Sequence, residues 1–317
     1  MLPHTLVYYI LSLTTVAYAH PPPASYHPDT RHRADVQNSI PGSHADPHSS
    51  SLQPPRQIRT PTRYESTLLA RRLLALSSTG YLSTSFPSAQ NLSADPAYRW
   101  TPSEVAGAAI GLPEYFAACN GGSESEEDGG DPVMIRLRIS TTGKNSRNGG
   151  NVSLGVDWWS QEHLRERRGS QSFDAMGWID RSPSSLPRMA LLGYLEVLDD
   201  EEVEKQKVVQ CFERRHADAK HWRPGSERGA HTGEWVRLRV KAVYWVGGFG
   251  GRAWIGWLDV EGEWDRVKRE GWENVRLPGE EGWEKMPWFE GGQEAWMETV
   301  GVEASMGQDV DMMRYES

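Results

Sequence analysis

A group of basic and hydroxyl side chains between residues 136 and 145 has the composition of a phosphate-binding site. Arg136 and Arg138 lie on the same face of a predicted strand, and the turn after that strand contains Ser140–Asn145. Arginine pairs with phosphate through two parallel N–H bonds, and the turn adds an ammonium group. A solvated outer face or a subunit interface would have the same composition. The candidate cofactor-binding residues in this group are Arg136, Ser140, Thr141, Thr142, Lys144 and Asn145.

The predicted strand Trp235–Val246 has a similarly mixed face. Successive side chains of a strand point to opposite faces, so the even and odd positions separate. Basic residues bordered by aromatic ones can hold a phosphate together with a stacked ring. A solvated face or a subunit interface again remains the alternative. The even positions, predicted to face the core, are Val236, Leu238, Val240, Ala242, Tyr244 and Val246, and the odd positions are Trp235, Arg237, Arg239, Lys241, Val243 and Trp245.

The common catalytic motifs are missing from the chain. It contains no G-x-S-x-G nucleophile elbow, no P-loop, no H-E-x-x-H and no C-x-x-C. The glycine cluster 247–251 departs from the dinucleotide fingerprint, because Ala253 stands where the third glycine would be and a strand is predicted on either side. It is therefore predicted to be a hairpin-like connection. His216 and His221 are five residues apart, a spacing that does not share a helix face, and no metal site is predicted.

The two cysteines, Cys119 and Cys211, allow two interpretations. They are either a disulfide or two free thiols, one of them a nucleophile. An even pair in a secreted chain favours the disulfide, and closing a loop of about 90 residues would stabilise the fold by about 4 kcal/mol in the chain-entropy model. No basic cluster flanks Cys119 to lower the pKa of its thiol.

The elements that must position these residues are mostly strands with alternating apolar residues. Thr62 and Glu65 form a capping box that begins a helix ending near Ser77, and Asp199 with Asp200 can cap a second helix reaching about Arg215. Residues 88–132 are predicted to be mostly loop. The absence of a strand–helix rhythm favours an α+β architecture, an antiparallel barrel or strongly curved sheet. Strands are predicted at 81–86, 133–140, 152–158, 189–198, 235–246 and 253–258, with a short helix at about 260–271.

The N-terminal third differs in composition from the rest. Residues 1–19 have the apolar run and the Ala17-Tyr18-Ala19 cleavage pattern of a secretory signal peptide. Residues 20–61 are rich in proline and histidine, poor in aliphatic residues, and predicted to be disordered. Secretion would make the sequons at Asn91 and Asn151 glycosylation sites. No apolar run approaches the roughly 20 residues needed to span a bilayer, so no membrane contact is expected once the signal is cleaved.

The charge is concentrated at the C-terminus. The net charge is −9, whereas residues 259–317 contribute 16 acidic and 6 basic side chains, so the other 258 residues sum to about +1. An acidic chain of this kind disfavours nucleic acid as a partner. All 14 tryptophans lie at or beyond Trp100. We predict one domain at 62–278 with polar insertions at about 121–131 and 160–185, followed by an acidic, partly disordered tail at 279–317.

Several segments taken together, in order over about residues 65–258, resemble the CREG-like β-barrel family, within the pyridoxine-phosphate-oxidase-like, FMN-binding split-barrel group. The chain departs from that pattern at Gly251, where an acidic residue is common, at Ala217, where proline is common, and in its long insertions. The segments that carry the resemblance are Glu65–Leu74, Gly80–Thr84, Gly111–Cys119, Ser140–Asn145, Ser185–Arg188, Leu192–Glu196, Cys211–Phe212, His216–Trp222, Tyr244–Gly250 and Arg252–Trp257.

The resemblance implies a split β-barrel that pairs as a homodimer, with flavin held at the subunit interface in related enzymes. It also implies secretion and glycosylation, since CREG-type members are secreted glycoproteins with an obstructed flavin site, while other branches bind FMN or haem. Arg252 in the last matching segment joins the candidate cofactor residues on this ground.

Two functions follow as hypotheses. The first is a secreted, dimeric split-barrel glycoprotein that binds a partner protein or a small molecule and does not catalyse a reaction. The alternative is an FMN-dependent oxidoreductase, with the FMN phosphate at Arg136, Lys144 and the hydroxyls of Ser140–Thr142 and the isoalloxazine against an aromatic residue of the other subunit. Flavin chemistry requires few protein acids or bases, so the missing motifs are compatible with both.

Overall fold

The structure is a computed structural model, and it describes residues 59–119, 131–161, 183–226, 232–249, 252–267 and 271–289. All of these lie in one compact unit of the chain, Gln53–Ser317. The predicted signal peptide, nearly all of the proline- and histidine-rich segment, most of both polar insertions and residues 290–317 lie outside the described residues.

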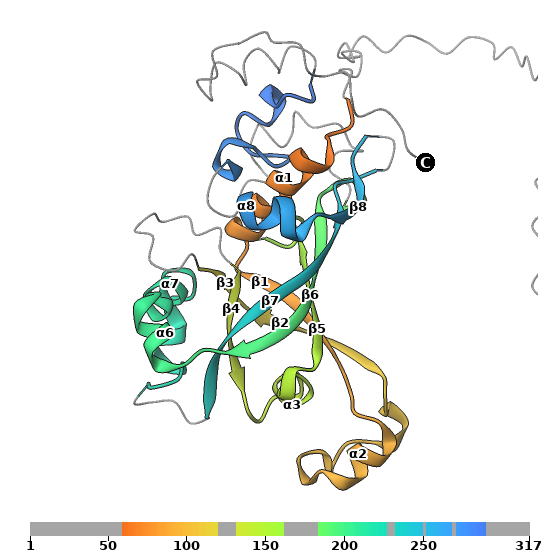
Figure 1. The fold of residues 1–317 in the computed structure, drawn as a ribbon, viewed down its shortest axis with the longest axis vertical. Helices are drawn as coiled ribbons and strands as arrows, with labels where there is room; N and C mark the ends of the chain where they lie inside the picture. The colour runs from red at the N-terminus through yellow and green to blue at the C-terminus, as the bar shows by residue number, and fades with distance from the viewer. Residues whose placement is uncertain are drawn as a thin grey trace, which may run out of the picture. The chain divides into compact units, whose positions relative to one another are not determined.

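One antiparallel sheet organises the described chain (Figure 1). Its strands follow the order β2-β1-β5-β6-β7-β4-β3, and β8 pairs with β7 beside that path. The six predicted strands are all present, and the α+β class with a curved antiparallel sheet is confirmed. The bounds are β1 Thr79–Ser85, β2 Ala109–Tyr115, β3 Ala117–Ala118, β4 Pro132–Leu137, β5 Asn151–Asp157, β6 Arg188–Val197, β7 Gly233–Val246 and β8 Ile255–Leu258.

The two ends of this strand order are nearly one stretch of chain. β2 pairs with β1 at one edge and β3 pairs with β4 at the other, yet only Phe116 separates β2 from β3. This bent segment therefore joins both edges of the sheet and gives it the curvature of a barrel. Phe116 is fully buried at the bend. The loop prediction for residues 88–132 is wrong at β2, whose seven residues have no alternation of buried and exposed side chains that periodicity would detect.

A β-bulge divides β7 into two parts, and the even-numbered side chains point to opposite faces of the sheet in the two parts. Leu192 pairs with Ala242 and Gly193 with Val240, so Lys241 is an extra residue without a partner on β6. A one-residue slip moves every later side chain to the other face. The predicted core face is thus right for Val236 and Leu238 but wrong beyond the bulge, where Val243 and Trp245 are fully buried and Tyr244 is 37% exposed. Gly193 is required here, because a Cβ on it would lie 1.9 Å from the Arg239 carbonyl oxygen.

The helices pack around the sheet, with α1 against one end of the barrel core (Figure 1). α1 begins with the predicted capping box, in which Thr62 and Glu65 satisfy each other's backbone amides. The predicted helix 199–215 is interrupted, because Lys207 adopts a left-handed backbone conformation between two shorter helices. The helices are α1 Arg63–Leu76, α2 Ala89–Ala94, α3 Thr141–Asn145, α6 Asp200–Lys205, α7 Val208–Arg215 and α8 Asp265–Val267, with a π-helical turn Val260–Trp264 before α8.

The segment 271–289 is packed against α1, so the ordered part of the chain continues past residue 278. The Arg72 guanidinium of α1 donates two hydrogen bonds of 2.7 Å to the Glu280 carboxylate, and both residues are buried. Glu280 also accepts a 2.6 Å bond from the Leu277 amide. Trp272 and Trp288 join the main hydrophobic core. None of the described helices is long and apolar enough to cross a membrane.

Candidate functional site

The predicted phosphate-binding turn forms α3 and its cap. The Ser140 hydroxyl accepts the Gly143 amide at 2.9 Å and donates to the Leu137 carbonyl at 2.9 Å, so it serves as the N-cap of this short helix. Thr141 is half-buried on the first turn. Gly143 allows the turn to close on the preceding strand, since a Cβ there would lie 2.1 Å from the Leu137 carbonyl oxygen. The hydroxyl of Ser140 is therefore used by the backbone.

Arg136 is neutralised by a carboxylate on the neighbouring strand. Its Nη2 lies 2.6 Å and its Nε 3.1 Å from Glu234 Oε2, and Arg138 contacts the other oxygen at 2.8 Å. Burial disfavours the charged form of Glu234, but the hydrogen bonds from Arg136 and Arg138 prevail and lower the pKa of that carboxyl. Arg136 on β4 and Arg138 just after it thus share one internal counter-ion.

The remaining polar side chains of α3 connect it to distant parts of the chain. Thr142 donates a 2.6 Å hydrogen bond to Glu114 of β2, and Lys144 Nζ donates to the Ala97 carbonyl at 3.2 Å. Asn145 accepts from the Tyr98 hydroxyl at 3.0 Å and donates to Thr84 at 3.1 Å. Burial raises the pKa of Glu114 despite the Thr142 bond. These bonds orient α3 against strands β1 and β2.

An open polar cavity of about 410 Å³ lies beside α3. Its lining contains the Lys144 side chain and the Asn91 side chain of α2, while Arg147 at its edge pairs with Asp95 at 3.3 Å. Asn91 and Asn151 are both exposed, on α2 and on the first residue of β5. Both predicted sequons therefore lie at the α3 end of the barrel (Figure 1).

The cofactor candidates do not form a vacant phosphate site. Arg136 is paired with Glu234, Ser140 caps α3, and Lys144 is bonded to a backbone carbonyl. An FMN phosphate would have to replace these bonds with its own, and α3 is only five residues long. Among the described residues, the side chains predicted to hold FMN are therefore already engaged and do not fit its phosphate group.

Arg252 lies at a different place from the other six candidates. It follows β7 and lines an aromatic cavity, whereas Glu234, the partner of Arg136, is at the start of the same strand. Trp245 at the cavity is eleven positions after Glu234, roughly 35 Å along an extended strand. The structure therefore brings six predicted cofactor residues together at α3 and places Arg252 just after the opposite end of β7. Figure 1 shows α3 far from β8, which pairs with that end of β7.

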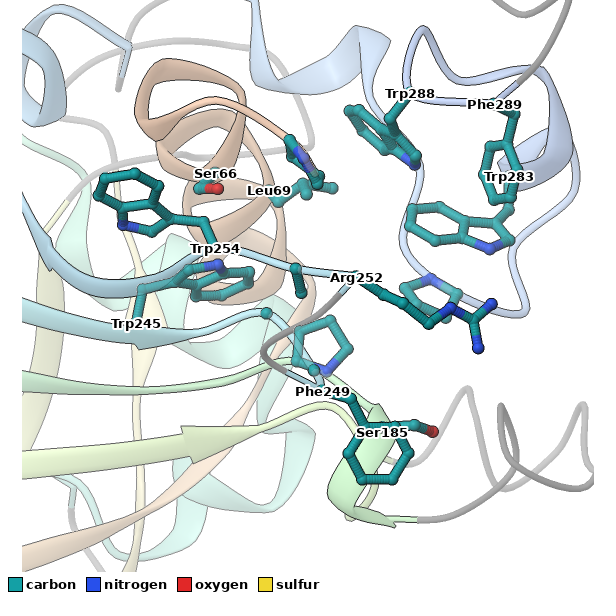
Figure 2. A pocket seen from close by; sticks show the side chains of 16 residues that line it. Ser66, Leu69, Ser185, Trp245, Phe249, Arg252, Trp254, Trp283, Trp288 and Phe289 are labelled. Atoms are coloured by element: carbon teal, nitrogen blue, oxygen red, sulfur yellow. The ribbon is translucent and has the colours of Figure 1, made fainter. Parts of the chain in front are cut away.

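The aromatic cavity is the feature that motif reasoning missed (Figure 2). It has a volume of about 90 Å³ and lies between the end of β7, the start of α1 and the segment 271–289. Its only sequence signals were the concentration of tryptophan in the second half of the chain and the glycine-rich turn after β7. Its aromatic lining consists of Trp245, Phe249, Trp254, Trp283, Trp288 and Phe289.

The two cysteines are paired and join α7 to the barrel. Cys119 and Cys211 form a disulfide across 92 residues of sequence, with Cα atoms 6.0 Å apart. Beside it, His216 Nε2 lies 2.9 Å from the carbonyl oxygen of Phe116, and its ring stacks on Tyr115 with centroids 4.3 Å apart. Burial lowers the pKa of His216, which favours the neutral ring. This histidine has a structural position at the bend that joins β2 to β3.

Comparisons with known proteins identify the family but add little about the ligand. A search of curated proteins finds no match. Similar solved structures include a haem-binding protein from Mycobacterium smegmatis (18% identity, 61% of this chain and 57% of that one, TM-score 0.37) and a protein of unknown function from Agrobacterium tumefaciens (18%, 65% and 65%, 0.37). An FAD-binding protein from Mesorhizobium loti is 15% identical over 59% of this chain and 94% of its own, with a TM-score of 0.33.

The chain matches less than two thirds of the length of the first two of these proteins. The TM-scores are too low to carry an argument about function. The family profile described as "CREG, beta-barrel" matches residues 61–264, more than half of the chain. It covers the whole sheet together with α1, α3 and α7, on which the resemblance in the sequence depends. The chain belongs to the CREG β-barrel family.

Proposed function

We propose that this CREG-family chain is a secreted, dimeric glycoprotein that acts by binding and does not catalyse a reaction, and that its flavin site is vestigial. The observation that carries this proposal is the state of the α3 residues. Arg136 and Lys144, the two cations expected to hold a flavin phosphate, are bonded to Glu234 and to the Ala97 carbonyl. A carboxylate next to the guanidinium also repels an incoming phosphate, because the two anions would share one counter-ion.

Secretion and glycosylation are supported by the disulfide and by the exposure of the sequons. A disulfide between buried cysteines is typical of chains that fold in an oxidising compartment. The two sequon asparagines are exposed, as a glycan requires. A glycan on Asn91 would stand at the mouth of the cavity that Lys144 lines and would obstruct it further.

The proposed dimer uses the outer face of the sheet. Strand pairing places Tyr81, Gly155, Ala190, Tyr244 and Trp257 in one row across five adjacent strands. Tyr81 and Trp257 are 53% and 57% exposed, and Tyr244 contacts Trp257 edge to face. Exposed aromatic residues in a continuous row, with small residues between them, are typical of a surface that another protein covers. A second copy of this chain is the occupant we propose.

The visible spectrum of the purified protein tests the binding role against the oxidoreductase alternative. We expect a colourless protein with no saturable binding of added FMN or haem. Flavin absorbance that co-purifies with the protein, and that disappears in the Arg136→Ala, Lys144→Ala double variant, would overturn the proposal and establish a flavin-binding protein. Arg147→Ala is the matched control, since Arg147 is a nearby exposed cation that the flavin hypothesis does not use.

Separate measurements test secretion and pairing. When the chain is expressed with its native N-terminus, the culture medium should contain a protein that lacks residues 1–19. This protein should lose mass on treatment with a glycosidase. Sedimentation should give a dimer, converted to a monomer by Tyr81→Glu with Trp257→Glu. Retention of residues 1–19 without glycan would refute the extracellular placement, and a monomeric wild type would refute the interface.

A further inference from the structure

The segment between β1 and β2, residues 86–108, buries few apolar side chains. It contains α2 and two short 3₁₀ helices, Pro96–Tyr98 and Ser103–Val105, and Figure 1 shows α2 projecting away from the sheet. All of its residues are described, and only Leu92 and Tyr98 among its apolar residues are buried. A segment with so little apolar burial opens locally at a low cost in free energy. We call residues 86–108 the α2 arm.

Polar contacts at α3 join the α2 arm to the barrel. The Tyr98 hydroxyl donates to Asn145 at 3.0 Å, and Arg147 pairs with Asp95 at 3.3 Å. The side chains of Arg147 and Asp95 are 40% and 42% exposed, and exposed ion pairs contribute little to stability. The polar cavity of about 410 Å³ lies along this junction. The junction therefore has space for a group that would strengthen it.

One face of α2 is turned toward this cavity. Asn91, Ala94 and Asp95 all line it, and their spacing of three and four residues places them on one side of the helix. Asn91 is exposed and begins the sequon Asn91-Leu92-Ser93. The other sequon asparagine, Asn151, is not among the lining residues. A sugar attached to Asn91 would thus begin at the wall of the cavity.

The size and the lining of the cavity suit a sugar ring. Its volume lies within the range of about 300–1,000 Å³ that is usual for small-molecule sites. The lining offers hydrogen-bond donors on Lys144, acceptors on Asp95, and the half-buried ring of Pro87. N-acetylglucosamine, the first sugar of an N-linked glycan, is neutral and carries hydroxyls and an acetamide, so it uses donors and acceptors together.

Attachment to Asn91 makes even weak contacts with this sugar sufficient. A free sugar loses translational and rotational freedom when it binds, whereas a tethered one is already held beside its site. A short tether corresponds to a local concentration in the millimolar range. The tether therefore favours occupation of an open, polar cavity that would bind the free sugar only weakly.

We propose that the first N-acetylglucosamine of a glycan on Asn91 occupies this cavity and fastens the α2 arm to α3. The sugar has a structural role there, as the other polar groups of α3 do. This inference rests on the proposed function, because it requires that Asn91 is glycosylated in the secreted chain.

The rate of sugar removal tests the position of the glycan. The full chain, secreted from a host that attaches high-mannose glycans, is treated with an endoglycosidase that cleaves between the first two N-acetylglucosamines. We expect the Asn91 glycan to be cleaved at least three- to tenfold more slowly in the native chain than in the denatured chain, the protection that one hydrogen bond provides. Mass spectrometry of the glycopeptide measures both rates.

A pair of alanine variants connects this protection to the cavity. Ala94 lines the cavity and Ala89 does not, although both are exposed on α2 and lie outside the sequon. Ala94→Trp fills the space with an indole and should remove the protection of the Asn91 glycan. Ala89→Trp is the matched control and should retain it. An indole that merely blocked the enzyme would slow cleavage, the opposite result.

Hydrogen exchange tests the effect of the sugar on the α2 arm, and it remains informative if Ala94→Trp does not fold. The glycosylated wild type is compared with Asn91→Gln and with Asn151→Gln, which removes the other sequon. We expect amides of residues 86–108 to exchange three- to tenfold faster in Asn91→Gln. Asn151→Gln should leave these rates unchanged.

The outcomes separate this inference from the proposed function. An Asn91 that carries no glycan in the secreted chain would overturn both the proposed glycosylation at this site and the inference. A glycosylated Asn91 whose glycan is cleaved equally fast in the native and denatured chains would overturn the inference alone. Equal protection in Ala94→Trp and Ala89→Trp, or unchanged exchange in Asn91→Gln, would do the same.

Discussion

The two ends of β7 use polar groups in opposite ways. At the α3 end, Arg136, Lys144 and Ser140 are satisfied by Glu234, a backbone carbonyl and the helix itself. At the other end, Trp245 and Ser66 are buried donors whose acceptors are not found among the described residues. The end with the composition of a phosphate site is therefore structural, and the end composed of tryptophan and glycine has the unused hydrogen-bonding capacity.

This contrast shows what residue type alone can indicate about a site. Arginine, lysine and serine bind ligands only if the fold leaves their donors free, and strand pairing decides that. Tryptophan contributes mostly to cores, yet each indole has one N–H that must find an acceptor when buried. Residue type therefore identifies a possible ligand site only together with the hydrogen-bond partners that the fold provides.

The largest expected effect comes from the buried ion pair that holds the aromatic end together. Glu280→Ala leaves Arg72 as an uncompensated buried charge, so we expect the free energy of unfolding to fall by about 3–5 kcal/mol. Urea denaturation measures this change in the free energy of unfolding. Glu281→Ala is the control, because the neighbouring Glu281 is exposed. A loss below about 1 kcal/mol would mean that the segment 271–289 is not anchored through this pair.

At the α3 end, Gly143→Ala should destabilise the fold by about 2–3 kcal/mol, since the added Cβ would overlap the Leu137 carbonyl oxygen and overpacking costs of this order are usual. Gly155→Ala is the control, because its Cβ would have an ordinary contact of 3.7 Å. Thermal unfolding monitored by circular dichroism compares the two. Equal stability of both variants would show that α3 is free to move away from its strand, and the contrast between the two ends would weaken.

A smaller, pH-dependent effect is expected at the bend between the edges of the sheet. Burial lowers the pKa of His216 in the folded chain below its unfolded value, which is about 6.5. The folded state therefore binds this proton less readily, so the stability from the neutral ring is complete above about pH 6.5 and is lost as the pH falls through the lower folded pKa. His216→Gln should flatten the pH dependence of the free energy of unfolding in that window. An unchanged slope would contradict it.

The smallest effect is expected for Lys144. Lys144→Met keeps the aliphatic stem and loses one hydrogen bond to the Ala97 carbonyl, so stability should change by about 0.5–1.5 kcal/mol. Inorganic phosphate should raise the melting temperature of neither the wild type nor the variant. If phosphate raised the melting temperature of the wild type but not of Lys144→Met, the α3 end would be a ligand site. The contrast between the two ends of β7 would then be wrong.

Patterns among neighbouring residues were sufficient to locate most strands and the start of the first helix. The alternation of apolar residues located β4, β5 and β7, an apolar run located β6, and the Thr62–Glu65 pair located the start of α1. The segments matching a known family extended this to the barrel itself. For the two cysteines, the sequence left a disulfide and a free nucleophile as alternatives, and the structure pairs them.

Only the tertiary structure decided which polar groups are free. Arg136 and Glu234 are 98 residues apart, and Arg72 and Glu280 are 208 residues apart, so no local pattern pairs them. The bulge at Lys241 exchanged the two faces of β7, because side-chain direction in a strand depends on cumulative register and not on the residue itself. The sequence by itself determined where six strands of this barrel lie, because their apolar patterns are local. The tertiary structure decided where β2 and β3 pair, which partners neutralise the charges and which buried donors lack an acceptor among the described residues, because these depend on long-range pairing.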